Sequence, residues 1–537
     1  MTINDRHYYI KIAWLLIFGS ALFRLLFAGL FPLSPDETNY WQWSRHPAWS
    51  YHDQAPMIAW LIRLSTQYLN HSEITVRLPS VIAMTVASIY LFLIARRWLG
   101  VAVGFKTVLL SQSILLFYLG GLLATPDGLQ AAAWAGACYH IARAYDSGKS
   151  YQWLMGGIWF GFGLLSKYTM IIFLPCAFCY GLYSQVHRKR LLSIWPYIGV
   201  IFGLLMFWPV IRWNLNNDLN SFRHIAFIGG ANNHFALHFK YFAEYLGAQA
   251  ALLSPLVFVL VIVAWPLALF QPRSDRKWIY SYLFFTSFPM FLGFALLSVH
   301  TRVYGNWPGA GYLTASVLVA AFFGVRKKQI LKRKNQGKKL WPYALNTSFL
   351  ISAIVLLQTS APFLPVPVKL DRTATEITGW PELGKKARVF MDAMPDPQKT
   401  FLFGLRYQIA SELAFYTPGQ PETVSINRWN RPNVYDYWWN DEELLGFDAV
   451  GVSGNANLQP LLEQVFERVE PPLEMKIYRH YVTRNWRYFP SDLVEKPVKF
   501  YYLYRAYGFK GGLRWIPPSN GDIRNSVSAI PYTSSRG

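Results

Sequence analysis

Long hydrophobic runs separated by short polar segments fill the first two thirds of the chain. A membrane-spanning helix needs roughly 20 mostly apolar residues, and about eleven runs approach that length. They lie at residues 11–31, 79–98, 104–123, 128–145, 152–166, 168–185, 191–213, 248–270, 278–298, 307–325 and 344–364. The pattern predicts a polytopic α-helical membrane protein with about 11 transmembrane helices.

Basic residues indicate which way the predicted spans run. Clusters of Lys and Arg occur at alternate loops, namely at 96–97, 143–149, 187–190, 272–277 and 326–339. Loops rich in Lys and Arg remain on the cytoplasmic side. The remaining loops are therefore expected to face outward, and these are 32–78, 124–127, 166–168, 214–247, 299–306 and everything after about 366.

The pattern changes after residue 366. Short β-rich runs such as "KTFLFG" and "FDAVGVSG" alternate with helical stretches such as "RYQIASELAFY" and "LQPLLEQVFERV". Such alternation predicts a small α/β domain. We therefore expect a transmembrane domain over residues 1–366, with a first periplasmic loop at 32–78, and a periplasmic α/β domain over residues 367–537.

Composition agrees with a membrane protein and argues against a nucleic-acid-binding one. The chain is 53% hydrophobic, 17% aromatic and only 15% charged. Most of the net charge of +22 lies in the short basic loops between apolar runs, where the topology rule already explains it. The three cysteines all fall within apolar runs, so no disulfide framework is indicated.

Few carboxylates are available for chemistry on the outer face. Seven lie in the predicted outer loops before residue 366: Asp36, Glu37, Asp53, Glu73, Asp127, Asp218 and Glu244. "Ser34-Pro35-Asp36-Glu37" is a good helix start, in which Ser34 caps and Glu37 closes a capping box. Capping explains Glu37 but does not fully explain Asp36.

"Thr125-Pro126-Asp127" repeats this arrangement at another outward helix start. A favourable first-turn charge is one interpretation of both Asp36 and Asp127. Their position at the outer membrane interface favours a functional interpretation, because ionisable groups there are costly and often functional.

Cations occur on the same predicted side: Lys167, Arg212, His300 and Arg302. Each one alone is explained by snorkelling or by lipid head-group contact. Together, beside acidic groups, they would form a site for an anionic phosphate group. The Trp and Tyr residues of 40–51 form either an interfacial belt or a platform for a sugar ring or polyprenyl chain.

Other motifs are weak or missing. His52 and Asp53 are adjacent candidate metal ligands, but no spaced third or fourth ligand accompanies them, so no metal site is assigned. The sequence has no P-loop, no GxGxxG and no GxSxG motif. A nucleotide-consuming enzyme is therefore disfavoured.

Six segments, in order along nearly the whole chain, resemble the bacterial glycosyltransferase family 39 proteins. They are "SPDETNYWQWSRHPAWSYHDQAPMIAWLIRL", "ATPDGLQAAAWA", "GFGLLSKYTMIIFLP", "WPVIRWNLNNDLNSF", "VYGNWPGAGYLTA" and "RYQIASELAFYTPGQP". This family is related to the protein O-mannosyltransferases and to the lipid A aminoarabinose transferase. The resemblance implies the C-type glycosyltransferase fold.

The resemblance also implies an activity. Such enzymes transfer a sugar, with inversion, from a polyprenyl phosphate (undecaprenyl phosphate in bacteria) on the periplasmic side of the inner membrane. By resemblance Asp36 is the catalytic carboxylate, Glu37 supports it and Asp127 lines the site. Lys167, Arg302, Arg212 and His300 would then bind the donor phosphate. No cofactor is required, and a divalent metal is optional because fixed cations can neutralise the phosphate.

One departure concerns the first outer loop. Relatives often carry "DHPP" where this chain has Asp53-Gln54-Ala55-Pro56. Contacts made by that His cannot be transferred to this chain, and either the donor specificity differs or His52 substitutes.

The expected partners are a polyprenyl-phosphate sugar, a lipid or glycan acceptor such as lipid A, and membrane lipids. A protein O-glycosyltransferase is an alternative within the same class. A transporter or flippase for lipid-linked sugars is disfavoured, because transporters place polar groups near the bilayer midplane and often contain inverted repeats.

Overall fold

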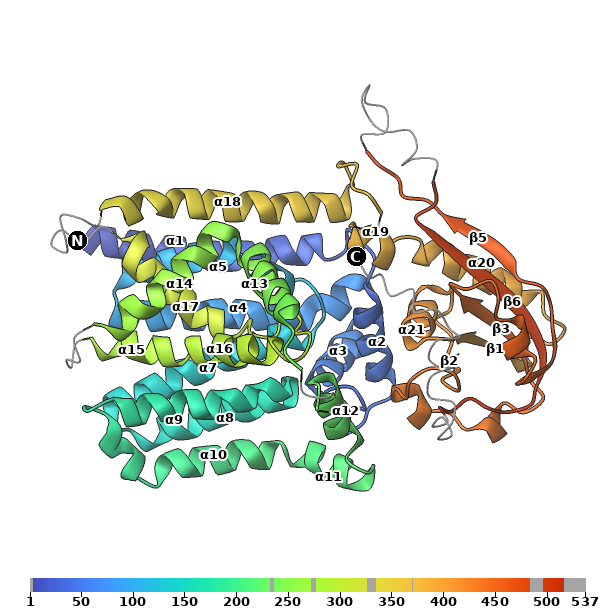
Figure 1. Cartoon of the computed structure of the whole chain (residues 1–537), viewed down its shortest axis with the longest axis horizontal. Helices are drawn as coiled ribbons and strands as arrows, with labels where there is room; N and C mark the ends of the chain where they lie inside the picture. Colours follow the sequence, from blue (N-terminus) through green and yellow to red (C-terminus); the bar gives the residue numbers. More distant parts are fainter. Residues whose placement is uncertain are drawn as a thin grey trace. The chain divides into compact units, whose positions relative to one another are not determined.

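A computed structural model describes residues 3–231, 236–271, 277–325, 335–368, 370–482 and 496–515 (Figure 1). The chain forms two compact units. Unit 1 contains Met1–Ala28 and Ala48–Val355, and unit 2 contains Gly29–Pro47 and Leu356–Gly537. The expected domain division at residue 366 remains a prediction, and the segment that carries Asp36 belongs to unit 2.

All regular secondary structure among the described residues of unit 1 is helical. Its helices are α1 (Ile3–Phe27), α3 (Met57–Tyr68), α4 (Glu73–Trp98), α5 (Val101–Ser113), α6 (Leu115–Gly120), α7 (Pro126–Ser147), α8 (Ser150–Ser166), η1 (Tyr168–Ile172), α9 (Phe173–Tyr183), η2 (Arg188–Leu192), α10 (Trp195–Met206), α11 (Trp208–Asn216), α12 (Asn220–Ile228), α13 (Phe239–Leu253), α14 (Pro255–Leu269), α15 (Trp278–Phe285), α16 (Phe288–Ser298), α17 (Gly311–Val319) and η3 (Ala320–Gly324). Helix α18 (Asn335–Ser360) follows and contains the unit boundary.

Several of these helices are long and apolar enough to cross a membrane. By length and composition, four described helices qualify, or up to six when each bent pair is one span. The structure therefore supports a membrane protein with several apolar helices, and the count of about 11 spans is not confirmed. The difference has a structural cause, because many predicted runs are divided into shorter helices.

Two of these divisions follow from the local sequence. Helices α10 and α11 bend by 47° next to Pro209, and α13 and α14 bend by 106° next to Pro255. A proline at the start of a helix cannot donate a backbone hydrogen bond to the preceding turn. Ser254, which precedes Pro255, has φ of 71°, a conformation that few non-glycine residues adopt.

Small residues allow the helices of unit 1 to pack closely. Gly157 on α8 lies so near Gly199 on α10 that a Cβ atom on Gly157 would overlap the Gly199 carbonyl. Small residues at helix contacts are typical of membrane bundles, in which backbones approach closely.

Unit 2 is built around a mixed sheet (Figure 1). Its strands, in the order β2-β1-β3-β6-β4 with β5 also paired to β6, are β1 (Thr400–Gly404), β2 (Thr423–Ser425), β3 (Asp448–Ser453), β4 (Phe466–Val469), β5 (Leu473–Ile477) and β6 (Lys499–Phe509). Strand β1 is parallel to β2 and β3, whereas β6 is antiparallel to its neighbours. The α/β alternation predicted from sequence is therefore present.

Unit 2 also contains several helices. They are α2 (Pro35–Arg45), α19 (Arg372–Glu376), α20 (Trp380–Asp392), α21 (Tyr407–Tyr416) and α22 (Gln459–Leu462), with the short helices η4 (Pro397–Lys399), η5 (Val434–Tyr437) and η6 (Asp441–Glu443). Alternate residues of β1 enter different cores: Leu402 packs with α20 and α21, and Phe401 and Phe403 pack on the other face.

One predicted helix of the C-terminal region is wrong in part. The sequence predicts a helical stretch at "LQPLLEQVFERV", but α22 ends at Leu462 and residues 466–469 form β4. Phe466 and Val469 are buried in the sheet core, so pairing with β6 outweighs the local helical pattern.

Candidate functional site

Helix α2 of unit 2 presents Asp36 and Glu37 in its first turn. Glu37 is fully buried, and its Oε2 accepts hydrogen bonds from the backbone N of Ser34 at 2.9 Å and from the Ser34 hydroxyl at 3.1 Å. Asp36 is exposed. The capping role predicted for Glu37 is confirmed, and Asp36 is left outside the capping interaction.

The rest of unit 2 fixes α2 in place. The Trp41 ring packs edge-on against Phe415 of α21 with ring centroids 4.9 Å apart, and the backbone N of Leu33 donates to the Tyr416 hydroxyl at 2.6 Å. At the other end of α2, Arg45 and His46 pair with Glu422 at 2.5 and 3.1 Å. Asp36 therefore stands on a helix anchored at both ends.

The electrostatics of this anchor involve Glu422. Partial burial raises its pKa, but hydrogen bonds from His46 and Arg45 and their positive charges outweigh burial and hold the pKa below its ordinary value. The stabilisation from this pairing is therefore fully present at any pH above the ordinary pKa of Glu. It is lost only as the pH falls through the lowered pKa of Glu422.

In unit 1, three segments far apart in sequence meet at Asp127. Lys167, which directly follows α8, places its Nζ 2.8 Å from Asp127 Oδ1, and the Lys167 side chain is only 7% exposed. Asn306 Nδ2 donates to both carboxylate oxygens at 3.2 Å. We call Asp127, Lys167 and Asn306 the carboxylate cluster. Sequence reasoning selected Asp127 and Lys167 but missed Asn306, although "VYGNWP" was among the resembling segments.

The other predicted donor-phosphate residues have different surroundings. The Arg302 side chain is 71% exposed and its Nε lies 3.3 Å from Glu244. His300 Nε2 lies 3.2 Å from the Gly230 carbonyl, and Arg212 is exposed on α11. Arg302 precedes Asn306 by four positions in the same loop, so the Cα atoms of these two residues lie at most about 14 Å apart.

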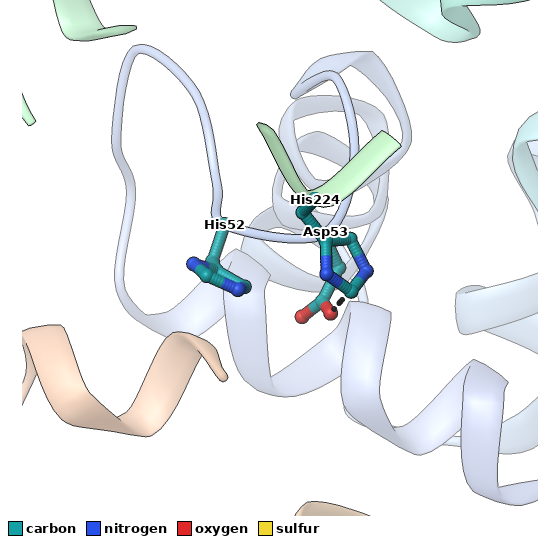
Figure 2. A group of neighbouring side chains, drawn as sticks. All are labelled: His52, Asp53 and His224. Carbon is teal, nitrogen blue, oxygen red and sulfur yellow. Dashed lines mark ion pairs between the residues drawn. The ribbon is translucent and has the colours of Figure 1, made fainter. Parts of the chain in front are cut away.

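A second cluster in unit 1 joins His52 and Asp53 to His224 of α12 (Figure 2). His224 Nε2 lies 3.2 Å from Asp53 Oδ1, the two imidazole rings are 5.0 Å apart, and the three candidate ligand atoms lie within 4.8 Å of one another. His52 is 5% exposed. We call this the histidine cluster.

Hydrogen bonds tie the histidine cluster to the segment that carries Lys167. The hydroxyl of Tyr168, the next residue, lies 2.7 Å from the Ser221 hydroxyl on α12 and 3.4 Å from that of Ser50. The Tyr168 side chain thus fixes both α12 and the loop containing His52.

The residues of the histidine cluster fit a divalent cation. Two imidazoles and one carboxylate form a common ligand set for zinc and other divalent transition metals. Next to them, the Gln54 Oε1 atom is buried and has no hydrogen-bond partner among the described residues. An amide oxygen is a further suitable ligand for hard cations. His224 supplies the spaced third ligand that the sequence did not reveal.

Comparisons with known proteins agree with the resemblance seen in the sequence. Residues 53–213 match the family described as dolichyl-phosphate-mannose-protein mannosyltransferase. The lipid A galacturonosyltransferase RgtD of Rhizobium johnstonii is 23% identical over 338 residues, which cover 60% of this chain and 64% of that relative. The chain thus spans slightly less than two thirds of this curated relative.

Solved structures show the same fold along nearly the whole chain. ArnT from Cupriavidus metallidurans in the apo state has a TM-score of 0.57 and 13% identity, covering 93% of this chain and 97% of that one. The same ArnT bound to undecaprenyl phosphate has a TM-score of 0.55 and 12% identity, covering 94% and 98%. The apo oligosaccharyltransferase of Archaeoglobus fulgidus has a TM-score of 0.53 and 12% identity, covering 86% and 71%.

Proposed function

We propose that this chain, a glycosyltransferase of the family 39 type with the C-type fold, transfers a sugar from a polyprenyl phosphate to lipid A or another envelope lipid or glycan. The observation that carries the proposal is the carboxylate cluster, at which three segments of the resemblance meet. The relative's name supports lipid A as acceptor, and the undecaprenyl phosphate bound to ArnT supports the donor class.

We assign the proton transfer to Asp36. The acceptor hydroxyl oxygen forms a bond to the anomeric carbon while the bond from that carbon to the phosphate oxygen breaks. The hydroxyl proton passes to the Asp36 carboxylate, and the electron pair leaves with the polyprenyl phosphate. Asp36 is an exposed carboxylate in the first turn of α2, where an acceptor hydroxyl can approach it from solvent.

We propose that Lys167, assisted by Arg302, binds the phosphate group as it leaves the sugar. The Lys167 ammonium has three donors, and the recorded contact with Asp127 uses one of them. Asp127, which accepts hydrogen bonds from Asn306 at both carboxylate oxygens, then positions Lys167 and does not act as the base. A cation held in place stabilises charge that develops in the transition state.

We place the active site on the periplasmic side of the bacterial inner membrane. The support is the alternation of basic loops, which assigns the loops containing Asp36, Asp127 and Lys167 to the outer face. Protein remains an alternative acceptor, favoured by the description of the family that matches residues 53–213.

The histidine cluster provides a test that is independent of transfer. We propose that it holds a divalent cation, which would supply positive charge beside the outer loop. His224→Gln should lower the affinity for Zn²⁺ by more than about 100-fold, because loss of an outer-shell partner alone costs about 10–100-fold. Calorimetric titration of chelator-treated protein with Zn²⁺ measures this effect.

The control for this titration is His71→Gln, which removes an exposed histidine of the same outer loop. It should bind Zn²⁺ like the unaltered protein. Equal affinity in His224→Gln, or no binding by the unaltered protein, would contradict the metal assignment.

An apolar cavity near the carboxylate cluster suits a substrate lipid chain. It has a volume of about 490 Å³ and is lined by α3, α4, α7, α8 and the last residue of α10, with Leu64, Ile82, Leu129 and Trp159 among the lining residues. Leu129 follows Asp127 by two positions on α7. We propose that part of the polyprenyl chain of the donor occupies this cavity.

Ile82→Trp should narrow the mouth of this cavity, because the Ile82 side chain is 55% exposed and lines it. We expect the KM for the polyprenyl donor to rise about tenfold while kcat changes little, since about 1.4 kcal/mol of binding corresponds to tenfold. Steady-state kinetics measure this change in KM, and the control is Val259→Trp at a site on α14 with a similar exposure of 52%. Equal KM values in the two variants would contradict the assignment.

The experiment that tests the transfer itself uses purified protein reconstituted with a polyprenyl-phosphate sugar and either lipid A or a mixture of envelope proteins. Mass spectrometry of the acceptors should show the added sugar on lipid A and an equal amount of free polyprenyl phosphate. Sugar on protein alone would favour the alternative acceptor. Intact donor moved across the vesicle membrane without any product would overturn the proposal in favour of a transporter.

A further inference from the structure

A second apolar cavity lies toward the other end of unit 1. It has a volume of about 320 Å³ and is lined by the C-terminal half of α7 and by α8, α9, η2 and α10. Tyr145, Trp153, Leu191 and Tyr197 are among its lining residues. Tyr145 follows Asp127 by 18 positions on α7, so about 27 Å of helix separates this cavity from the carboxylate cluster. Transfer chemistry therefore does not account for it.

Basic side chains stand beside this cavity. The turn η2, which supplies Leu191 to the lining, begins with Arg188, Lys189 and Arg190, and all three are exposed. None of the three is ion-paired with a carboxylate of the described residues. The cavity lining is otherwise almost entirely apolar, so positive charge is concentrated at one edge of a hydrophobic pocket.

One of these cations is held by the fold. The Arg190 guanidinium packs directly against Gly148, the residue in left-handed conformation that ends α7. A cation near the last turn of a helix is favoured by the free carbonyl groups there. Arg188 and Lys189 are not used in this way and are available to a ligand.

Residues that follow the basic turn have the character of a membrane interface. Leu192 is 88% exposed, Ile194 62% and Trp195 42%. Exposed aliphatic and Trp side chains next to Lys and Arg are typical of segments that lie among lipid head groups. The Tyr197 hydroxyl, at the cavity wall, donates to the Leu191 carbonyl at 3.0 Å and so ties α10 to the turn.

We propose that this cavity and the turn η2 form a binding site for an anionic phospholipid, with one acyl chain in the cavity and the phosphate between Arg188 and Lys189. The charge of the turn selects the occupant, because a zwitterionic lipid fills the cavity equally well but gains little from two cations that have no carboxylate partner among the described residues. Anionic lipids of the cytoplasmic leaflet meet basic segments of this kind. The site is independent of the proposed transfer reaction.

The charge requirement is tested with a double variant, Arg188→Gln with Lys189→Gln. Each basic residue near a membrane surface raises the affinity for anionic lipid about fivefold. Loss of both residues should therefore lower the affinity for phosphatidylglycerol about 30-fold. Native mass spectrometry of the full chain with added phosphatidylglycerol measures the bound lipid, and phosphatidylcholine is the reference lipid.

The matched control removes two other exposed basic residues, with Arg6→Gln and Lys11→Gln on α1. This control should keep the preference for phosphatidylglycerol. Equal loss in both double variants would overturn the proposal, because binding would then follow net charge alone. Equal binding of the two lipids by the unaltered chain would also overturn it.

The cavity requirement is tested separately. Val200→Trp would fill the cavity that Val200 lines, whereas Ile201→Trp alters the neighbouring residue, which is 56% exposed and outside the lining. We expect Val200→Trp to release phosphatidylglycerol and Ile201→Trp to retain it. Unchanged lipid retention in Val200→Trp, or competition by soluble glycerol phosphate at lipid-like concentrations, would show that the acyl chain is not held there.

Discussion

Asp36→Asn is expected to lower the rate of sugar transfer by about 10²–10⁴-fold, the range that a positioned general base contributes. The amide keeps the size of the side chain but cannot accept the acceptor proton. Asp36 is exposed and the capping interaction belongs to Glu37, so the variant should fold normally. Initial rates at saturating donor measure kcat, and donor binding should remain unchanged.

The control for this variant is Glu73→Gln, which neutralises another acidic residue in the first turn of an outward helix. A helix-dipole effect would change both variants slightly and equally, since a first-turn charge contributes about 0.3–1 kcal/mol. Normal transfer by Asp36→Asn would show that Asp36 is a first-turn charge and has no catalytic role.

Lys167→Gln is expected to produce the second large effect. Loss of a preorganised cation at the departing phosphate should lower kcat/KM by about 10²–10³-fold. Removing Lys167 also leaves the partly buried Asp127 carboxylate with Asn306 as its recorded partner, so stability should fall as well. Thermal unfolding and transfer rates of the same preparations measure the two effects.

A double variant separates these two effects. Lys167→Gln combined with Asp127→Asn removes both charges, so most of the lost stability should return, because an unpaired buried charge is what destabilises the single variant. Transfer should remain low, since the phosphate still lacks its cation. Recovery of transfer together with stability would show that Lys167 only neutralises Asp127.

The sequence predicted the class of the fold well and its details less well. Apolar runs and basic loops predicted a membrane protein, and alternation near β1 and β3 predicted the α/β unit. The helix count was not recoverable, because breaks such as those before Pro209 and Pro255 lie inside continuous apolar runs. Hydropathy does not distinguish a straight span from a bent one.

The candidate site was predictable wherever a local motif carried the signal. Asp36, Asp127 and Lys167 each stand at a recognisable helix end. Asn306 and His224 were missed because their roles depend on contacts with Asp127 and Asp53, which lie far away in the sequence. Spacing along the chain carries no information about such contacts until the fold joins the segments.

The most direct test of a catalytic role for Asp36 compares envelope lipids and glycans from three strains by mass spectrometry. The two strains that make the protein must contain it in equal amounts. One strain carries the unaltered protein, one lacks it and one carries Asp36→Asn. If Asp36 is the catalytic base, one sugar mass on lipid A or a related acceptor disappears in both altered strains. If that mass persists in the Asp36→Asn strain at the level of the unaltered protein, the catalytic assignment is contradicted.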